Sequence, residues 1–124
     1  MPGSPLGILL ISGGHERAHY AFILAAGAAA VGRMVTVFAT NEGCRALAAG
    51  GLADAGRDRA VREAGVAGLN ELWTAASELG VRLMACDAGL RMARLDPAAL
   101  LPGVEVAGVP AFLASVGTGQ IITL

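Results

Sequence analysis

The sequence contains no lysine, because all nine of its basic residues are arginines. It therefore has no side chain for a P-loop lysine, a lysine Schiff base or a lysine general base. Charge of either sign is scarce: charged residues make up 15% of the chain and the net charge is −1. A chain without a basic excess attracts phosphate backbones weakly, so we expect no nucleic-acid partner.

Aromatic residues are also scarce, at 4%, although 55% of the 124 residues are apolar. The apolar fraction excludes a disordered or collagen-like chain. The core must instead rely on small side chains and close backbone approach. The length suits one domain over residues 1–124, and so little charge on a small domain indicates surface hidden in a homo-oligomer, such as a dimer, trimer or hexamer.

Long hydrophobic runs are missing. The uncharged, Ala-rich apolar stretch from Ala18 to Gly32 is shorter than the ~20 residues of a membrane-spanning helix. Residues 1–6 carry no basic n-region of a signal peptide. We therefore expect a cytoplasmic protein with no membrane partner, and its two cysteines, Cys44 and Cys86, as free thiols.

Apolar segments alternate with helical ones along the chain. Strands are predicted at residues 7–11, 34–39, 81–85, 104–107 and 120–124, and helices at 15–31, 41–49, 69–79, 87–94 and 110–116. Thr40 and Asn41 are candidates to cap the second helix. Continuous apolar strands between helices indicate an α/β three-layer sandwich, a mostly parallel sheet with helices on both faces. Residues 50–68, rich in Gly, Ala and charge, form a candidate mobile excursion.

In such sheets, functional groups gather past the carboxyl ends of the strands. A candidate small-ligand pocket there comprises Ser12, Gly13, Gly14, His15, Asn41 and Asp87. An alternative to a non-functional role for His15 is that it helps bind a substrate at the strand end. The Ser-Gly-Gly turn lacks the glycine spacing of a dinucleotide-binding loop.

Residues 15–19, His-Glu-Arg-Ala-His, match the H-E-x-x-H pattern of zinc proteases. Such a site needs a third ligand and an open coordination position. The chain has only two histidines, and Phe22 stands where the extended motif requires glycine. Glu42 is the remaining candidate ligand, but it follows a different strand. We therefore expect no metal site and a surface or interface histidine pair.

Cys86 follows a predicted strand and precedes a predicted helix. Free backbone N–H groups at a helix start favour the reactive thiolate form. Arg91 and Arg94 would add positive potential, whereas Asp87 would oppose it or cap the helix. The alternative for Cys86 is a small buried residue at a strand end, and burial is the stronger interpretation for Cys44.

The carboxyl half, VRLMACDAGLRMARLDPAALLPGVEVAGVPAFLASV, resembles the DsrE/DsrF-like family of small sulfur-relay proteins. The amino half, LGILLISGGHERAHYAFILAAGAAAVGRMVTVFAT, resembles the opening strand, Ala-rich helix and second strand of the same family. The resemblance is weakest over residues 50–68. It implies about five strands, oligomeric assembly and a sulfane sulfur carried as a persulfide on Cys86.

The resemblance therefore implies a sulfurtransferase-like carrier with Cys86 as its reactive residue. Its partners would be sulfur donor and acceptor proteins or small thiols, and the chemistry requires no metal and no cofactor. The alternative is a non-catalytic oligomeric module on the same fold that binds a small ligand or a protein.

Overall fold

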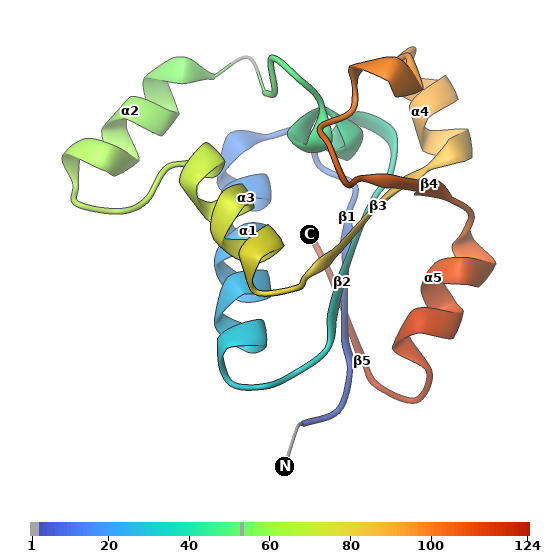
Figure 1. Ribbon diagram of the computed structural model, residues 1–124. Helices are drawn as coiled ribbons and strands as arrows, with labels where there is room; N and C mark the ends of the chain where they lie inside the picture. The colour runs from blue at the N-terminus through green and yellow to red at the C-terminus, as the bar shows by residue number, and fades with distance from the viewer. Residues whose placement is uncertain (1–2, 53) are drawn as a thin grey trace.

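Five strands occupy the centre of the structure, and helices surround them (Figure 1). The computed structural model describes residues 3–52 and 54–124. The strands are β1 (Leu6–Leu10), β2 (Val35–Ala39), β3 (Arg82–Cys86), β4 (Glu105–Ala107) and β5 (Gln120–Thr123). The helices are α1 (His15–Ala30), the 3₁₀ helix η1 (Asn41–Leu47), α2 (Ala55–Glu63), α3 (Leu69–Glu78), α4 (Asp87–Ala93), the 3₁₀ helix η2 (Pro97–Ala99) and α5 (Val109–Val116).

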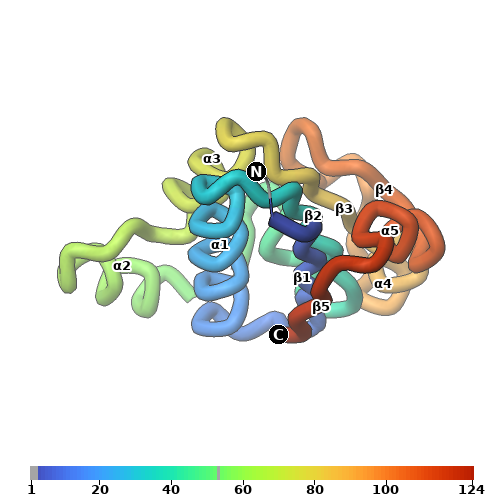
Figure 2. The backbone as a smooth tube through the Cα atoms, turned by 90° about the horizontal axis from the view of Figure 1, so that it is seen from below, coloured from blue at the N-terminus to red at the C-terminus, as the bar shows by residue number. Residues whose placement is uncertain are grey.

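The strands lie in the order β4-β3-β2-β1-β5, and every neighbouring pair is parallel. Helices α1 and α3 cover one face of the sheet and α5 covers the other (Figure 1, Figure 2). Helix α4 packs against η1. The predicted α/β three-layer sandwich with helices on both faces is confirmed, and its sheet is parallel throughout the described strands.

Apolar runs become the central strands because both faces of the sheet are covered. All five residues of β2 are buried, the pattern of a strand with helices above and below it. On α1, Ala18, Ala21, Phe22 and Ala25 are buried and share one face at helical spacing. These small side chains let the helix backbone lie close to the sheet.

The boundaries near two candidate residues differ from the prediction. Strand β3 includes Cys86 itself, because this residue pairs with Ala107 of β4. Thr40 occupies the N-cap position of η1, but its side chain makes no capping hydrogen bond. Its hydroxyl instead donates to Oδ1 of Asn41 at 3.4 Å.

Residues 50–68, the segment expected to leave the core, contain α2. None of the residues of α2 is buried, and Figure 2 shows the helix projecting beyond α1. Asp54 starts the helix by accepting a hydrogen bond from the backbone N–H of Arg57 at 3.1 Å. Polar contacts rather than core packing therefore join α2 to the rest of the molecule.

The helices are short. Helix α1 has 16 residues, which corresponds to about 24 Å at 1.5 Å per residue. Within residues 3–52 and 54–124, none of the helices combines the length and the apolar content needed to cross a bilayer.

Gly7 of β1 permits the closest approach of α5 to the sheet. A Cβ atom at this position would lie 2.5 Å from Cγ2 of Val116 and 2.8 Å from Cζ of Phe112. The Phe112 ring stacks on Phe38 with centroids 4.8 Å apart. These three side chains form a second core cluster with Met84 on the α5 side of the sheet.

Replacing Gly7 by Val should lower the free energy of unfolding by about 1–3 kcal/mol, because the added atoms overlap a packed helix. Gly27→Ala is the control, since a Cβ at this exposed helix position meets nothing within 4 Å. It should raise stability by about 0.5–1 kcal/mol. Urea unfolding monitored by circular dichroism measures both, and an unaffected Gly7→Val protein would refute the close approach of α5.

Candidate functional site

The turn after β1 lies against η1 at the carboxyl edge of the sheet. Within the turn, the hydroxyl oxygen of Ser12 accepts a hydrogen bond from the backbone N–H of Gly14 at 3.0 Å. A Cβ on Gly13 would lie 2.8 Å from Cβ of Glu42, the second residue of η1. The glycine therefore lets the exits of β1 and β2 come into contact.

Cys86 ends β3 and is the N-cap residue of α4. The backbone N–H of Gly89 donates to Sγ of Cys86 at 3.4 Å. The cysteine is 6% exposed and belongs to the same core cluster as Phe38 and Phe112. The sulfur therefore stands at the start of α4 with a backbone N–H pointing toward it.

Gly89 also joins the first turn of α4 to the exit of β2. A Cβ at this position would contact the hydroxyl of Thr40 and would lie 2.5 Å from the backbone nitrogen of Asn41. Asn41 has a φ of 51°, a left-handed conformation that asparagine tolerates better than most residues. The structure thus brings Asn41 and Cys86 to the same end of the sheet, with only a glycine between α4 and the β2 exit.

Asp87, beside the cysteine, directs its charge to the outside of α4. Its carboxylate forms an exposed ion pair with Arg91 at 2.7 Å, one helical turn later. Arg94 ends the helix in a left-handed conformation, with φ at 56°. Arg91 therefore neutralises the carboxylate that stands next to the thiol.

Cys44, in η1, is the more deeply buried thiol. It has no exposed surface, and its S–H donates to the backbone carbonyl of Ala39 at 3.5 Å. Burial, followed by the nearby charge of Cys86, raises the pKa of Cys44 to about 11. This residue therefore stays a neutral thiol at physiological pH.

The two histidines of the H-E-x-x-H pattern are both buried in the first half of α1. Their rings stack with centroids 5.3 Å apart. Nε2 of His15 lies 2.8 Å from the carboxylate of Asp58, and Nε2 of His19 lies 2.8 Å from the backbone carbonyl of Ala67. Both partners are pure acceptors, so Nε2 carries the hydrogen on each ring.

These hydrogen bonds tie α1 to the segment that contains α2. Glu42, the third ligand considered for zinc, instead pairs with Arg45. Among the residues that the structure describes, none of the groupings of His, Cys, Asp and Glu has the three members that could hold a metal ion. Of the expected surface or interface histidine pair, the surface alternative is wrong, because the segment that follows Asp54 covers both rings.

Asp58 is the centre of this polar cluster, and the sequence reasoning placed it in a solvated excursion. Its Oδ1 accepts hydrogen bonds from His15 and, at 2.9 Å, from the backbone N–H of Leu69, and its Oδ2 lies 3.1 Å from Arg62. Burial alone would raise the pKa of Asp58, but these hydrogen bonds and the charges of Arg62 and His15 outweigh it and lower the pKa.

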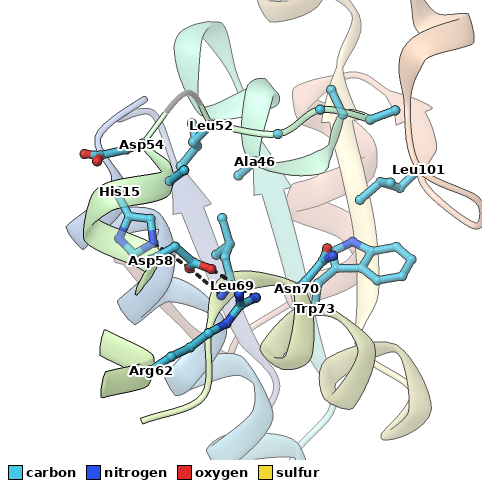
Figure 3. A pocket seen from close by; sticks show the side chains of 15 residues that line it. His15, Ala46, Leu52, Asp54, Asp58, Arg62, Leu69, Asn70, Trp73 and Leu101 are labelled. Carbon is cyan, nitrogen blue, oxygen red and sulfur yellow. Dashed lines mark hydrogen bonds and ion pairs between the residues drawn. The ribbon is translucent and has the colours of Figure 1, made fainter. Parts of the chain in front are cut away.

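A pocket of about 440 Å³ opens beside Asp58, between α2, α3 and the segment that follows η1 (Figure 3). Figure 3 shows His15 and Asp58 on one side of it and Trp73 with Leu101 on the other. Its principal polar residues are His15, Asp54, Asp58, Arg62 and Asn70, and its larger apolar ones are Leu52, Leu69, Trp73 and Leu101.

The pocket predicted from the sequence and the pocket found in the structure have only His15 in common. Ser12, Gly13, Gly14, Asn41 and Asp87 lie outside the set of residues that line it. The sequence reasoning missed Asp58 and Trp73 as pocket residues. The one usable signal was the helical spacing of Leu69, Leu72 and Trp73, which predicts a buried face but not a cavity.

Replacing Asp58 by Asn should lower the free energy of unfolding at pH 7 by about 1–3 kcal/mol, because buried His15 loses a charged acceptor. In the folded state the pKa of Asp58 is lowered from its ordinary value of 3.8. The stabilisation is therefore fully present above pH 3.8, and it is lost as the pH falls through the pKa of the folded state. Urea unfolding of both proteins from neutral to acid pH measures the difference, which should close at the acid end.

Asp87→Asn is the matched control, since it removes a carboxylate from an exposed ion pair. It should change stability by less than about 1 kcal/mol. A difference between wild type and Asp58→Asn that stays constant over the whole pH range would contradict the role of the ionised carboxylate.

Comparison with known proteins places this geometry in a family. The sequence is 29% identical over 147 residues to the uncharacterized protein YrkE of Bacillus subtilis (strain 168), covering 92% of each chain. The fold is similar to the ychN protein from E. coli, with a TM-score of 0.76, 12% identity and coverage of 98% of this chain and 100% of that one. It is also similar to MTH1491 of Methanobacterium thermoautotrophicum, a protein of unknown function, with a TM-score of 0.68, 20% identity and the same coverage. The DsrE/DsrF-like family model matches residues 6–124, so the chain belongs to the DsrE/DsrF-like family.

Proposed function

We propose that this protein is a sulfur carrier that holds a persulfide on Cys86 and passes the sulfur to a partner thiol. The observation that carries the proposal is the hydrogen bond from the Gly89 N–H to Sγ of Cys86 at 3.4 Å. It places the sulfur at the start of α4, where backbone donors stabilise a thiolate. Membership of a family associated with sulfur relay supports the same conclusion.

The difference between the two thiols also supports Cys86 as the acceptor. Cys86 is 6% exposed, whereas Cys44 has no exposed surface. The pKa of Cys44, raised to about 11, keeps that sulfur protonated and therefore poorly nucleophilic. A sulfur donor thus meets one usable thiol on this chain.

The chemistry needs only that thiol and two partners. The Cys86 thiolate attacks the outer sulfur of a donor persulfide, R–S–SH, and forms a new S–S bond while the donor S–S bond breaks. The donor leaves as the thiolate R–S⁻ with the electron pair of the broken bond, and the proton stays on the transferred sulfur. An acceptor thiolate then attacks the same outer sulfur and releases Cys86 as a thiolate.

Intact-protein mass spectrometry after incubation with inorganic polysulfide tests the proposal. The wild-type protein should gain the mass of one or more sulfur atoms, and treatment with a reductant should remove the added mass. Cys86→Ser should gain nothing, because the acceptor sulfur is absent. Cys44→Ser is the matched control and should gain the same mass as the wild type.

Circular dichroism of both variants establishes that each is folded before labelling. Added sulfur that persists in folded Cys86→Ser, or that disappears only in Cys44→Ser, would overturn the assignment of Cys86. A wild-type protein that gains no mass while both thiols titrate as free would overturn the carrier function itself.

We also propose that the protein works as a homo-oligomer, with the outer side of α5 in the interface. Val109 and Leu113 are one helical turn apart on this helix, and each is 50% exposed. Val106, in the neighbouring strand β4, is 45% exposed. Apolar side chains gathered in one place favour contact with another surface over contact with water.

Static light scattering at micromolar concentration should therefore give a mass that is a multiple of 12.4 kDa. Leu113→Glu should reduce that mass, because it places a charge in the apolar contact. Leu79→Glu makes the same change at a leucine of the other layer that is 48% exposed, and it should leave the mass unchanged. A wild-type monomer would refute the proposal.

A further inference from the structure

The pocket beside Asp58 lies in the opposite layer of the sandwich from Cys86. Its residues Leu52, Leu69 and Trp73 pack against the core cluster on the α1 and α3 side, whereas Cys86 belongs to the cluster on the α5 side. A volume of about 440 Å³ is within the range of pockets that hold small organic molecules. The sulfur-carrier chemistry proposed for Cys86 makes no use of this space.

The charged side chains of the pocket wall already have hydrogen-bond or ion-pair partners within the chain. Asp58 accepts hydrogen bonds from His15 and pairs with Arg62, which also lies 3.2 Å from Glu71 outside the pocket. Asp54 caps α2. An anionic ligand would face two carboxylates, and a cationic ligand would have to compete with Arg62 for Asp58. The wall therefore favours an uncharged ligand.

Two buried nitrogens of the wall have no partner among the described residues, Nδ1 of His15 and Nε1 of Trp73, and only the second is a donor in the tautomer assigned above. Nε1 of Trp73 is buried and makes no hydrogen bond with any residue that the structure describes. A buried N–H without an acceptor is unfavourable, and it needs a group that accepts. Trp73 lines the pocket, and the residue as a whole is only partly buried.

Apart from Asn70, the remaining wall is apolar and includes a broad flat surface. The indole of Trp73 and the side chain of Leu101 close one side of the pocket in Figure 3, and Leu69 lies between them and Asp58. Aromatic rings stack favourably on an indole face. From the volume, the compensated charge and the unpartnered indole N–H, we propose that this pocket binds a small, flat, uncharged heterocycle with a carbonyl acceptor for Trp73.

The chain provides its own reporter for this site, because Trp73 is its only tryptophan. A ¹⁵N–¹H spectrum contains one indole N–H signal, which belongs to the proposed contact. Quinolin-2-one, an uncharged bicycle with a ring carbonyl, is the probe. Naphthalene has the same shape without an acceptor, and quinoline-2-carboxylate has a similar ring system with a negative charge.

Quinolin-2-one should shift the indole signal saturably, and both comparison compounds should bind more weakly. In calorimetry, Trp73→Phe should weaken quinolin-2-one binding about fivefold, because the ring remains and one hydrogen bond is lost. Ser77→Ala, on an exposed part of the same helix, should leave the affinity unchanged. Cys86→Ser should also bind normally, which separates this site from the sulfur carrier.

The proposal is overturned if quinolin-2-one causes no saturable shift up to its solubility limit. It is overturned equally if naphthalene and the carboxylate bind as tightly as quinolin-2-one, or if Trp73→Phe binds it with unchanged affinity. Loss of binding in a folded Cys86→Ser protein would place the ligand at the cysteine instead.

Discussion

The close approach of backbones at glycine is the constraint on which this structure depends. With few aromatic side chains to fill space, α5 lies on the sheet at Gly7, and a Cβ on Gly43 would overlap the carbonyl of Leu10. Gly89, which also has no Cβ, lets α4 lie close to the exit of β2. The contacts at Gly43 and Gly89 fix elements near the carboxyl edge, and the second of them sets the position of the helix start that donates to Cys86.

The layered fold could be predicted because its signals are local. The strand at residues 34–39 is a short apolar run that stops at a polar residue, and Gly32 follows the helix before it. Such runs appear as strands in the structure with boundaries displaced by about one residue. The helix start after Cys86 could be anticipated for the same reason, since a strand and a helix meet there with no loop between them.

The polar side of the molecule could not be predicted, because its contacts join distant segments. Asp58 lies 43 residues after His15, and nothing in either local sequence indicates that the two side chains meet. A run of Asp, Arg and Glu with no apolar face favours a solvated helix, which α2 largely is. This pattern does not indicate that the carboxylate of Asp58 points inward and accepts a hydrogen bond from the buried ring of His15.

The strand order has a consequence for how the chain is made. Strand β1 lies between β2 and β5, and it is synthesised first of the five while β5 is synthesised last. Until β5 leaves the ribosome, β1 is an open edge whose N–H and C=O groups have no strand on one side. Helix α5, which covers Gly7, also emerges late. Until β5 is made, the nascent protein therefore exposes an edge of β1 that the finished sheet buries, and pairing of this edge with another chain would be damaging.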